Sequence, residues 1–167
     1  YKKIKYDVIV LLQGDEPLIN KSMLNKIVNT MINNPFIQIA NLMKKIESKE
    51  ETNNPNEIKV IFDKNLNAIN FSRLPIPYNH TKTNIKYYKQ VCVIPFRRKF
   101  LLKYSSLKPT LCEKAESIDM MRVLENGKKI KMVEIFDKVI SVDTPKDLLI
   151  AAQLLKKDKY TKKYIKN

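Results

Sequence analysis

Two short stretches of this sequence place a carboxylate directly after an apolar run, an arrangement that can bind a divalent cation. Val8–Leu12 is followed by Gln13-Gly14-Asp15-Glu16-Pro17, and residues 139–142 are followed by Asp143. Each apolar run predicts a strand buried on both faces, as in a parallel α/β sheet. The carboxyl ends of such strands open on the same side of the sheet, where open α/β sheets bind their ligands. Asp15 and Asp143 could then hold one magnesium ion together with waters and substrate phosphates.

The same residues also have a simpler interpretation. Gly14-Asp15 is typical of a turn with solvated acids, and Asp143 could be an acid that stabilises the start of a helix. Gly14 favours a ligand-binding loop, because the sequence has only two glycines and a residue without a Cβ lets the backbone approach a ligand or adopt a positive φ. The residues alone therefore indicate a magnesium-dependent, phosphate-handling α/β enzyme.

The charge balance leaves a second class of protein open. The chain of 167 residues has 32 Lys and Arg against 17 Asp and Glu, which gives a net charge of +15. Such a balance is compatible with a basic nucleic-acid-binding domain, which we keep as the alternative from another class. The basic residues are spread over nearly the whole chain, however, and no aromatic-basic RNA motif or helix-turn-helix pattern accompanies them. We therefore interpret most of the charge as a solvated surface and expect no nucleic-acid partner.

Cysteine, histidine and apolar content exclude several other classes. Cys92 and Cys112 form neither a Cys-x-x-Cys pair nor a disulfide framework, which favours a reducing cytoplasm. His80 is the only histidine, so a zinc site or a His-based triad is not expected. No apolar run reaches the roughly 18–20 residues of a membrane span. Residues 1–167 are expected to form one domain. Because the chain starts at Tyr1 rather than Met, we also expect an N-terminal portion to precede it.

Hydrophobic periodicity and capping signals predict the elements that must position Asp15 and Asp143. Expected helices cover residues 20–31, 97–104, 113–125 and 145–157, the last with Leu148, Ala151, Ala152 and Leu155 facing inward. Expected strands cover residues 8–12, 36–46, 57–63, 68–72, 87–96, 129–136 and 139–142, with a hairpin joining the third and fourth. Two prolines after Arg73, at positions 75 and 77, are expected to hold that cation on an extended segment.

Five motifs occur in an order that resembles one enzyme family. They are Gln-Gly-Asp-Glu-Pro-Leu-Ile at 13–19, Asn-Pro-Asn at 54–56 with Lys-Val at 59–60, Phe-Ser-Arg at 71–73 with Ile-Pro at 76–77, Arg-Val-Leu at 122–124 with Gly127, and Val-Asp-Thr-Pro-Lys-Asp-Leu at 142–148. This series closely resembles the 3-deoxy-manno-octulosonate cytidylyltransferase family, over residues 7–155.

The resemblance implies a Rossmann-like nucleotidyltransferase: a mixed, mostly parallel sheet flanked by helices, with a small β-rich insertion that supports a homodimer. The implied reaction uses CTP and Mg²⁺ to activate an eight-carbon acid sugar for lipopolysaccharide synthesis. The anomeric hydroxyl attacks the α-phosphate and pyrophosphate leaves. Asp15 and Asp143 match the metal-binding, catalytic aspartates, Gln13 and Gly14 lie beside them in the active site, and Arg73 matches an arginine near the sugar.

Two departures from the family pattern shape further expectations. The family's His-x-Gly-x-Tyr appears here as residues 90–94, Gln-Val-Cys-Val-Ile, and its Glu-Gln-Leu-Arg appears as residues 119–122, Asp-Met-Met-Arg. Gln90, Asp119 and Arg122 are then the candidate sugar contacts, and the substrate could be a different ulosonic acid, such as an 8-amino form or a nonulosonic acid.

The family's basic, glycine-containing triphosphate loop has no match before Asp7. We therefore expect the chain to be the C-terminal two-thirds of an enzyme and inactive alone.

Overall fold

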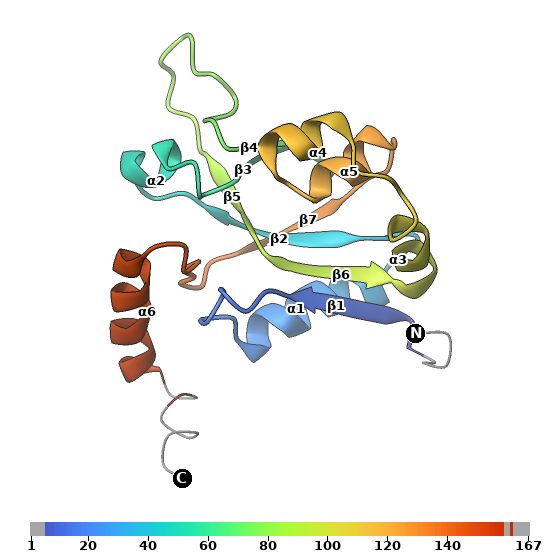
Figure 1. The fold of residues 1–167 in the computed structure, drawn as a ribbon, viewed down its shortest axis with the longest axis horizontal. Coiled ribbons are helices and arrows are strands. Elements are labelled where there is room, and N and C mark those ends of the chain that lie inside the picture. Colours follow the sequence, from blue (N-terminus) through green and yellow to red (C-terminus); the bar gives the residue numbers. More distant parts are fainter. Residues whose placement is uncertain (1–5, 159–160, 162–167) are drawn as a thin grey trace.

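The computed structural model describes residues 6–158 and 161, which form two strand assemblies flanked by helices (Figure 1). A five-stranded sheet has the order β4-β3-β5-β2-β7, and a two-stranded ribbon pairs β1 with β6. The strands are β1 (Val8–Leu12), β2 (Ala40–Lys45), β3 (Lys59–Phe62), β4 (Ala68–Ser72), β5 (Tyr88–Val91), β6 (Val93–Arg97) and β7 (Lys131–Ile135). The helices are α1 (Lys21–Ile32), α2 (Lys49–Asn53), α3 (Arg98–Tyr104), α4 (Leu111–Glu116), α5 (Met120–Glu125) and α6 (Pro145–Lys157).

The sheet is mixed, as expected, but its described part is not mostly parallel. Only β2 and β7 pair in parallel among the described strands, whereas the pairings β1–β6, β2–β5, β3–β4 and β3–β5 are antiparallel. Short connections join antiparallel neighbours, and a parallel pair needs a long crossover. The expected β3–β4 hairpin is confirmed, and together with β5 it brings antiparallel pairing into the sheet.

The strand expected over residues 87–96 is two strands that meet at Cys92. β5 pairs with β2, whereas β6 leaves the five-stranded sheet and pairs with β1. Figure 1 shows this change of partner as a bend between β5 and β6. The ribbon is thereby joined to the sheet at Cys92, and this junction lies at the site described below.

Helix α1 covers one face of the sheet, as its apolar spacing predicts. Met23, Ile27 and Met31 are buried and pack with apolar residues of β2, β5, β6 and β7. The side chain of Asn20 caps the helix by accepting a hydrogen bond from the Met23 N–H at 3.1 Å, which satisfies one of the free donors of the first turn.

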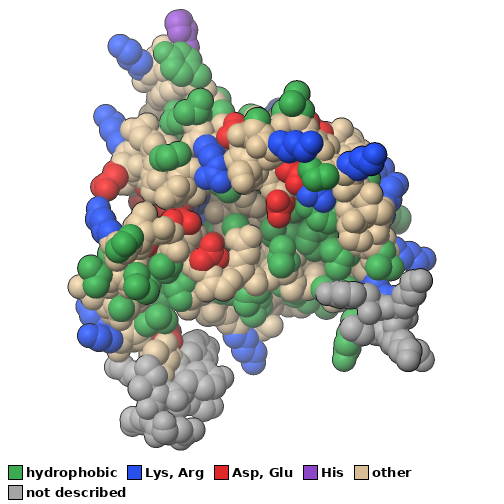
Figure 2. Space-filling model, viewed as in Figure 1, with side chains coloured by type: hydrophobic (Ala, Val, Ile, Leu, Met, Phe, Trp, Pro, Cys, Tyr) green, Lys and Arg blue, Asp and Glu red, His purple; other side chains and the backbone are tan. Residues whose placement is uncertain are grey.

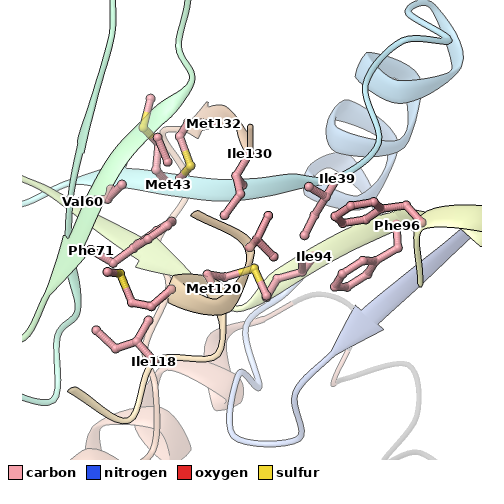
Figure 3. Packing of buried hydrophobic residues seen from close by; sticks show 14 residues of the cluster. Ile39, Met43, Val60, Phe71, Ile94, Phe96, Ile118, Met120, Ile130 and Met132 are labelled. Carbon is pink, nitrogen blue, oxygen red and sulfur yellow. The ribbon is translucent and has the colours of Figure 1, made fainter. Parts of the chain in front are cut away.

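The opposite face is covered by α3, α4 and α5, which enclose the larger core cluster (Figure 3). The single helix expected over residues 113–125 is interrupted at Ser117, whose backbone is left-handed with φ 53° and ψ 50°. The interruption has a packing reason, since the side chain of Ile118 directly after it is buried in this cluster beside Met120. The break also leaves Asp119 at the start of α5.

Two predictions of a strand buried on both faces are wrong, one in its burial and the other in the strand itself. β1 has its expected bounds but is not buried on both faces: Leu11 is 43% and Leu12 49% exposed, because β6 is its only strand partner in the described ranges. Residues 139–142 form no strand. They run alongside the 13–16 loop instead, where the Val142 N–H donates to the Asp15 carbonyl at 2.9 Å.

Helix α6 begins as predicted but packs differently. Thr144 and Asp147 form the expected capping box. Of the four residues expected to face inward only Ala151 is buried, and Leu148 is 59% exposed. Apolar side chains accordingly gather on the α6 surface at the lower left of Figure 2. No helix among the described residues has both the length and the apolarity of a membrane span.

Candidate active site

A cavity of about 290 Å³ lies where the 13–16 loop, the β5–β6 junction, the α4–α5 break and the 139–143 segment meet. Six of the predicted site residues line it: Gln13, Asp15, Arg73, Gln90, Asp119 and Asp143. Its other lining residues are Leu11, Asn56, Ile58, Cys92, Ile94, Ser117, Ile118, Met120 and Ser141. Figure 2 shows acidic side chains gathered in the middle of this face, between the α4–α5 region and α6.

Asp15 and Asp143 face the same cavity although 128 positions separate them in the chain (143 − 15 = 128). The hydrogen bond from the Val142 N–H to the Asp15 carbonyl holds the two segments side by side. Partial burial raises the pKa of Asp143, and the negative charges of Asp15 and Asp147 raise it further, whereas Arg73 opposes them. The negative charge that surrounds the Asp143 carboxylate favours a cation at this site.

This donor set fits Mg²⁺ better than a transition metal. Among the residues that the structure describes, no group of three or more His, Cys, Asp or Glu side chains is placed to hold a metal. Magnesium needs only one or two protein carboxylates, because waters and substrate phosphates complete its octahedron. Asp15 and Asp143 meet that requirement.

Arg73 is held rigidly at the rim of the cavity. Its Nε donates to the Glu116 carbonyl at 2.6 Å, Nη1 to the Pro55 carbonyl at 2.9 Å and Nη2 to the Ser117 carbonyl at 3.3 Å. These three bonds use three of the five guanidinium N–H groups, so two remain for a ligand. Arg73 is thus fixed by carbonyl acceptors of other segments. The extended segment expected after it is not present, because the chain bends at residues 73–74 and 76–77.

Gln90 lies on the cavity wall in a buried amide pair. Its Nε2 donates to Asn41 Oδ1 at 2.6 Å. Asn41 in turn donates through Nδ2 to the carbonyls of Leu42 and Val91, which fixes which end of the Asn41 amide faces Gln90. One N–H of Gln90 is therefore committed, and its carbonyl oxygen remains available as an acceptor.

The cavity does not include two of the predicted site residues, Gly14 and Arg122. Arg122 forms an ion pair with Glu113 and lies over the Tyr104 ring at 4.9 Å, so its guanidinium joins α4, α5 and α3. Gly14 lies in the loop but has no positive φ, and a Cβ there would meet nothing within 4 Å. The structure therefore gives no steric reason for a glycine at this position.

Three other lining residues, Ile94, Met120 and Cys92, offer the cavity apolar or unreactive side chains. Ile94 and Met120, which depart from the family pattern, are 3% and 1% exposed and belong to the core cluster as well as to the cavity. Burial, together with the negative charges of Glu16 and Asp15, raises the pKa of the Cys92 thiol to about 12. Cys92 is therefore a neutral thiol at physiological pH rather than a nucleophile.

The sequence shows Glu16 as a second carboxylate after β1, but it does not predict that this side chain is buried. Its side chain is buried beneath the cavity, and its carboxylate accepts hydrogen bonds from the Cys92 N–H at 3.2 Å and the Ser141 hydroxyl at 3.0 Å. Burial raises the pKa of Glu16. No local pattern distinguishes it from Asp15, since both follow the same strand; only contacts with residues far along the chain do so.

The chain matches the protein-family model described as Cytidylyltransferase over residues 1–130. A curated relative from Fusobacterium nucleatum, named 3-deoxy-manno-octulosonate cytidylyltransferase, is 44% identical over 147 residues, 88% of this chain and 60% of its own length. A relative of the same name from Christiangramia forsetii is 40% identical over 152 residues, 89% of this chain and 61% of its own length. The chain thus spans about 60% of the length of these relatives.

A solved structure shows the same fold. CMP:2-keto-3-deoxy-manno-octonic acid synthetase, complexed with CTP, has a TM-score of 0.85 and 31% sequence identity to this chain, and covers 94% of this chain and 65% of its own. The expected Rossmann-like nucleotidyltransferase fold is confirmed by this likeness.

Proposed function

Since this chain belongs to the cytidylyltransferase family, we propose that it serves the Mg²⁺-dependent transfer of CMP from CTP to the anomeric hydroxyl of 3-deoxy-manno-octulosonate (Kdo), with release of pyrophosphate. The observation that carries this proposal is the cavity that Asp15, Asp143 and Arg73 line together. The names of the relatives and the CTP complex of the similar structure support the choice of CTP and Kdo.

Asp15 and Asp143 are proposed to hold the Mg²⁺. When bound, the ion would supply charge neutralisation on phosphate oxygens and would lower the pKa of a coordinated hydroxyl. The two carboxylates would supply hard oxygen ligands, and waters and substrate oxygens would complete the coordination. Gln13 and the backbone at Gly14 lie in the same loop and are proposed to contact the nucleotide beside the metal.

The remaining polar groups are proposed to orient the sugar. The two uncommitted N–H groups of Arg73 suit the carboxylate of an acid sugar, because a guanidinium can form paired, charge-assisted hydrogen bonds. Gln90 and Asp119 offer acceptors to its hydroxyls. Arg122, predicted as a sugar contact, is proposed instead to hold α4 against α5 through Glu113 and so to keep Asp119 at the cavity. Most of the rate enhancement would then come from positioning and electrostatic stabilisation.

The substrate could also be another ulosonic acid, and one observation favours keeping this second candidate. Gln90, Ile94 and Met120, which replace a histidine, a tyrosine and a glutamine of the family pattern, all line the cavity. A wall with two apolar residues offers fewer hydrogen bonds to sugar hydroxyls than the family pattern would. Rates with Kdo, 8-amino-Kdo and a nonulosonic acid, measured side by side, separate the candidates.

We further propose a homodimer that works in the cytoplasm. Large apolar side chains on β4 and the loop after it are exposed: Ile69 by 57%, Leu74 by 72% and Tyr78 by 85%. A second copy that covered this loop, which projects from the body at the top left of Figure 1, would bury them. Sedimentation equilibrium should give twice the chain mass, and Tyr78→Lys should lower it to one chain.

Both cysteines are free, which fits a reducing compartment.

The test of the reaction is pyrophosphate release by the purified full-length protein, because residues 1–167 alone are expected to be inactive; it is supplied with CTP, Kdo and Mg²⁺. We expect release to require all three, and Asp15→Asn and Asp143→Asn each to lower the rate about 100-fold or more, since metal stabilisation is worth several kcal/mol. Glu50→Gln is the matched control, because Glu50 is an exposed carboxylate in a surface ion pair with Lys146. Release without Kdo, or full activity of Asp143→Asn, would contradict the proposal.

A further inference from the structure

Glu16 joins three segments that converge on the cavity but do not pair with one another in the sheet. It belongs to the loop after β1, and its Oε1 accepts from the Cys92 N–H at the β5–β6 junction and from the Ser141 hydroxyl before α6. The acceptor and its two donors are 76 and 125 positions apart in the chain. The side chain is 6% exposed, so these bonds are shielded from competing water.

These three segments carry the groups that the proposed reaction needs. Asp15 directly precedes Glu16, Gln90 lies two residues before Cys92, and Asp143 lies two residues after Ser141. The 13–16 loop and the 139–143 segment belong to no strand, so no ladder of backbone hydrogen bonds fixes their separation. The described hydrogen bonds that span the two are the Val142 N–H to the Asp15 carbonyl, and Ser141 to Glu16.

We propose that Glu16 is a positioning residue: its buried carboxylate sets the separation of Asp15 and Asp143 and thereby the affinity of the pair for a divalent cation. This inference rests on the proposed function, because it takes the two aspartates to be the cation ligands. Groups that orient metal ligands from behind typically contribute 10–100-fold to metal affinity. Glu16 holds the segments that carry the two aspartates, through its bonds to Cys92 and Ser141, and it is not among the residues that line the cavity.

The neutral isostere distinguishes a positioning residue from a third ligand. Glu16→Gln keeps a carbonyl oxygen that can accept from Cys92 and Ser141, but it removes the negative charge that a ligand to Mg²⁺ would supply. Glu16→Ala removes the acceptor and leaves the Cys92 N–H and the Ser141 hydroxyl without it. A positioning role therefore predicts that Gln restores what Ala loses, whereas a ligand role predicts that both variants lose affinity.

The experiment is a titration of the purified chain with Mn²⁺, followed by electron paramagnetic resonance, with no nucleotide or sugar present. We expect Glu16→Gln to bind within about threefold of the wild type, and Glu16→Ala to bind about 10–100-fold more weakly. Ser141→Ala, which removes one of the two bonds, should fall between them and provides the answer if Glu16→Ala does not fold. Asp63→Ala is the control for general destabilisation, since Asp63 accepts several hydrogen bonds in the β3–β4 turn, away from the cavity lining.

Each outcome of the titration supports or overturns the positioning role of Glu16. Wild-type affinity in both Glu16→Ala and Ser141→Ala overturns the positioning role, and so does a Glu16→Gln variant as weak as Glu16→Ala. A comparable loss in Asp63→Ala at equal thermal stability also overturns it, because the effect would then be one of overall stability. A wild-type chain that binds no Mn²⁺ overturns the proposed metal site itself, which is a distinguishable result.

Discussion

Cys92 and Asp143 line one cavity, and the loss of contact with water raises both pKa values with different chemical consequences. For the thiol, burial and the nearby acids raise the pKa to about 12, far above neutral pH. For Asp143, burial raises a pKa that starts from 3.8 and Arg73 limits the rise. The cavity thus presents carboxylates as its reactive groups and keeps its sulfur protonated.

Cys92 should therefore be nearly inert toward alkylation. At pH 8 we expect iodoacetamide to modify Cys92 at least about a hundredfold more slowly than a free cysteine, because only the thiolate reacts and its fraction is small when the pKa is near 12. Mass spectrometry of the peptide that contains Cys92, over time, measures the rate. Urea-unfolded protein is the control and should react at the free rate. Folded protein labelled as fast as unfolded protein would contradict the assigned environment.

Residue types at the cavity could be predicted from the sequence, but the direction in which each side chain points could not. Asp15 was identified from an apolar run and a loop, and Asp143 from a similar pattern plus a helix start, and both line the cavity. Arg122 matched a motif equally well, yet Glu113 nine positions earlier pairs with its guanidinium outside the cavity. Whether a carboxylate such as Glu16 faces a cavity or supports it from behind depends on partners 76 and 125 positions away.

At the scale of elements, the α4–α5 break determines how Asp119 and Ser117 reach the cavity. Ser117 ends α4 in a left-handed conformation, and its carbonyl accepts from Arg73. A side chain with a Cβ is strained there by about 1 kcal/mol relative to glycine. The break is thus maintained by the packing of Ile118 and by the Arg73 contact rather than by the preference of Ser117 itself.

Ser117→Gly should stabilise the protein. Relief of the left-handed strain is expected to raise the free energy of unfolding by about 0.5–1 kcal/mol, less the entropy that a glycine adds to the unfolded chain. Thermal unfolding followed by circular dichroism should show a rise of about 1–4 °C in the midpoint. Ser106→Gly, in a turn without positive φ, is the matched control and should not raise the midpoint. A lower midpoint for Ser117→Gly would show that its hydroxyl or Cβ contributes more than the strain removes.

Elements with their own local signals were the predictable ones. Helices α1 and α6 begin at the expected caps, and the β3–β4 hairpin lies where its polar connection placed it. Residues 139–142 have the composition of a strand, but a strand also needs a partner, and here the 13–16 loop provides a single backbone hydrogen bond. The apolar side chain of Leu148 follows helical spacing with Ala151 and Leu155, yet it is exposed because burial depends on what packs against the helix.

For the molecule as a whole, the carboxylates whose pKa values are shifted fall into two groups with opposite dependence of stability on pH. Glu113 has a pKa held below its usual value mainly by hydrogen bonding to Arg122, and hydrogen bonds from Asn67 lower that of Asp63. Glu16 and Asp143 have raised pKa values because of burial. The first group stabilises the fold when ionised, and the second is less unfavourable when protonated. Their sum, and not the net charge of +15 alone, determines how the fold responds to acid.

The contribution of Glu113 can be isolated by comparing the wild type with Glu113→Gln. Because the folded pKa of Glu113 lies below the unfolded value of about 4.5, its stabilisation is fully present above pH 4.5 and is lost as the pH falls through the folded pKa. At pH 7 we expect Glu113→Gln to be less stable by about 2 kcal/mol, the usual worth of hydrogen bonds to a charged group. The difference should narrow as the pH falls below 4.5 toward the folded pKa, because protonation of the carboxyl then competes with its hydrogen bonds to Arg122.

Urea denaturation at half-unit steps from pH 3 to pH 7 measures this difference directly. Raised-pKa groups such as Glu16 and Asp143 are present in both proteins, so their opposite slope cancels in the subtraction. Glu50→Gln should give a curve parallel to the wild type, since its exposed pair with Lys146 adds little to stability. A difference between the wild type and Glu113→Gln that stayed constant across this range would mean that the bond to Arg122 does not depend on the charge of Glu113. In that case packing, and not the ion pair between Glu113 and Arg122, would hold α4 against α5 and keep Asp119 at the cavity.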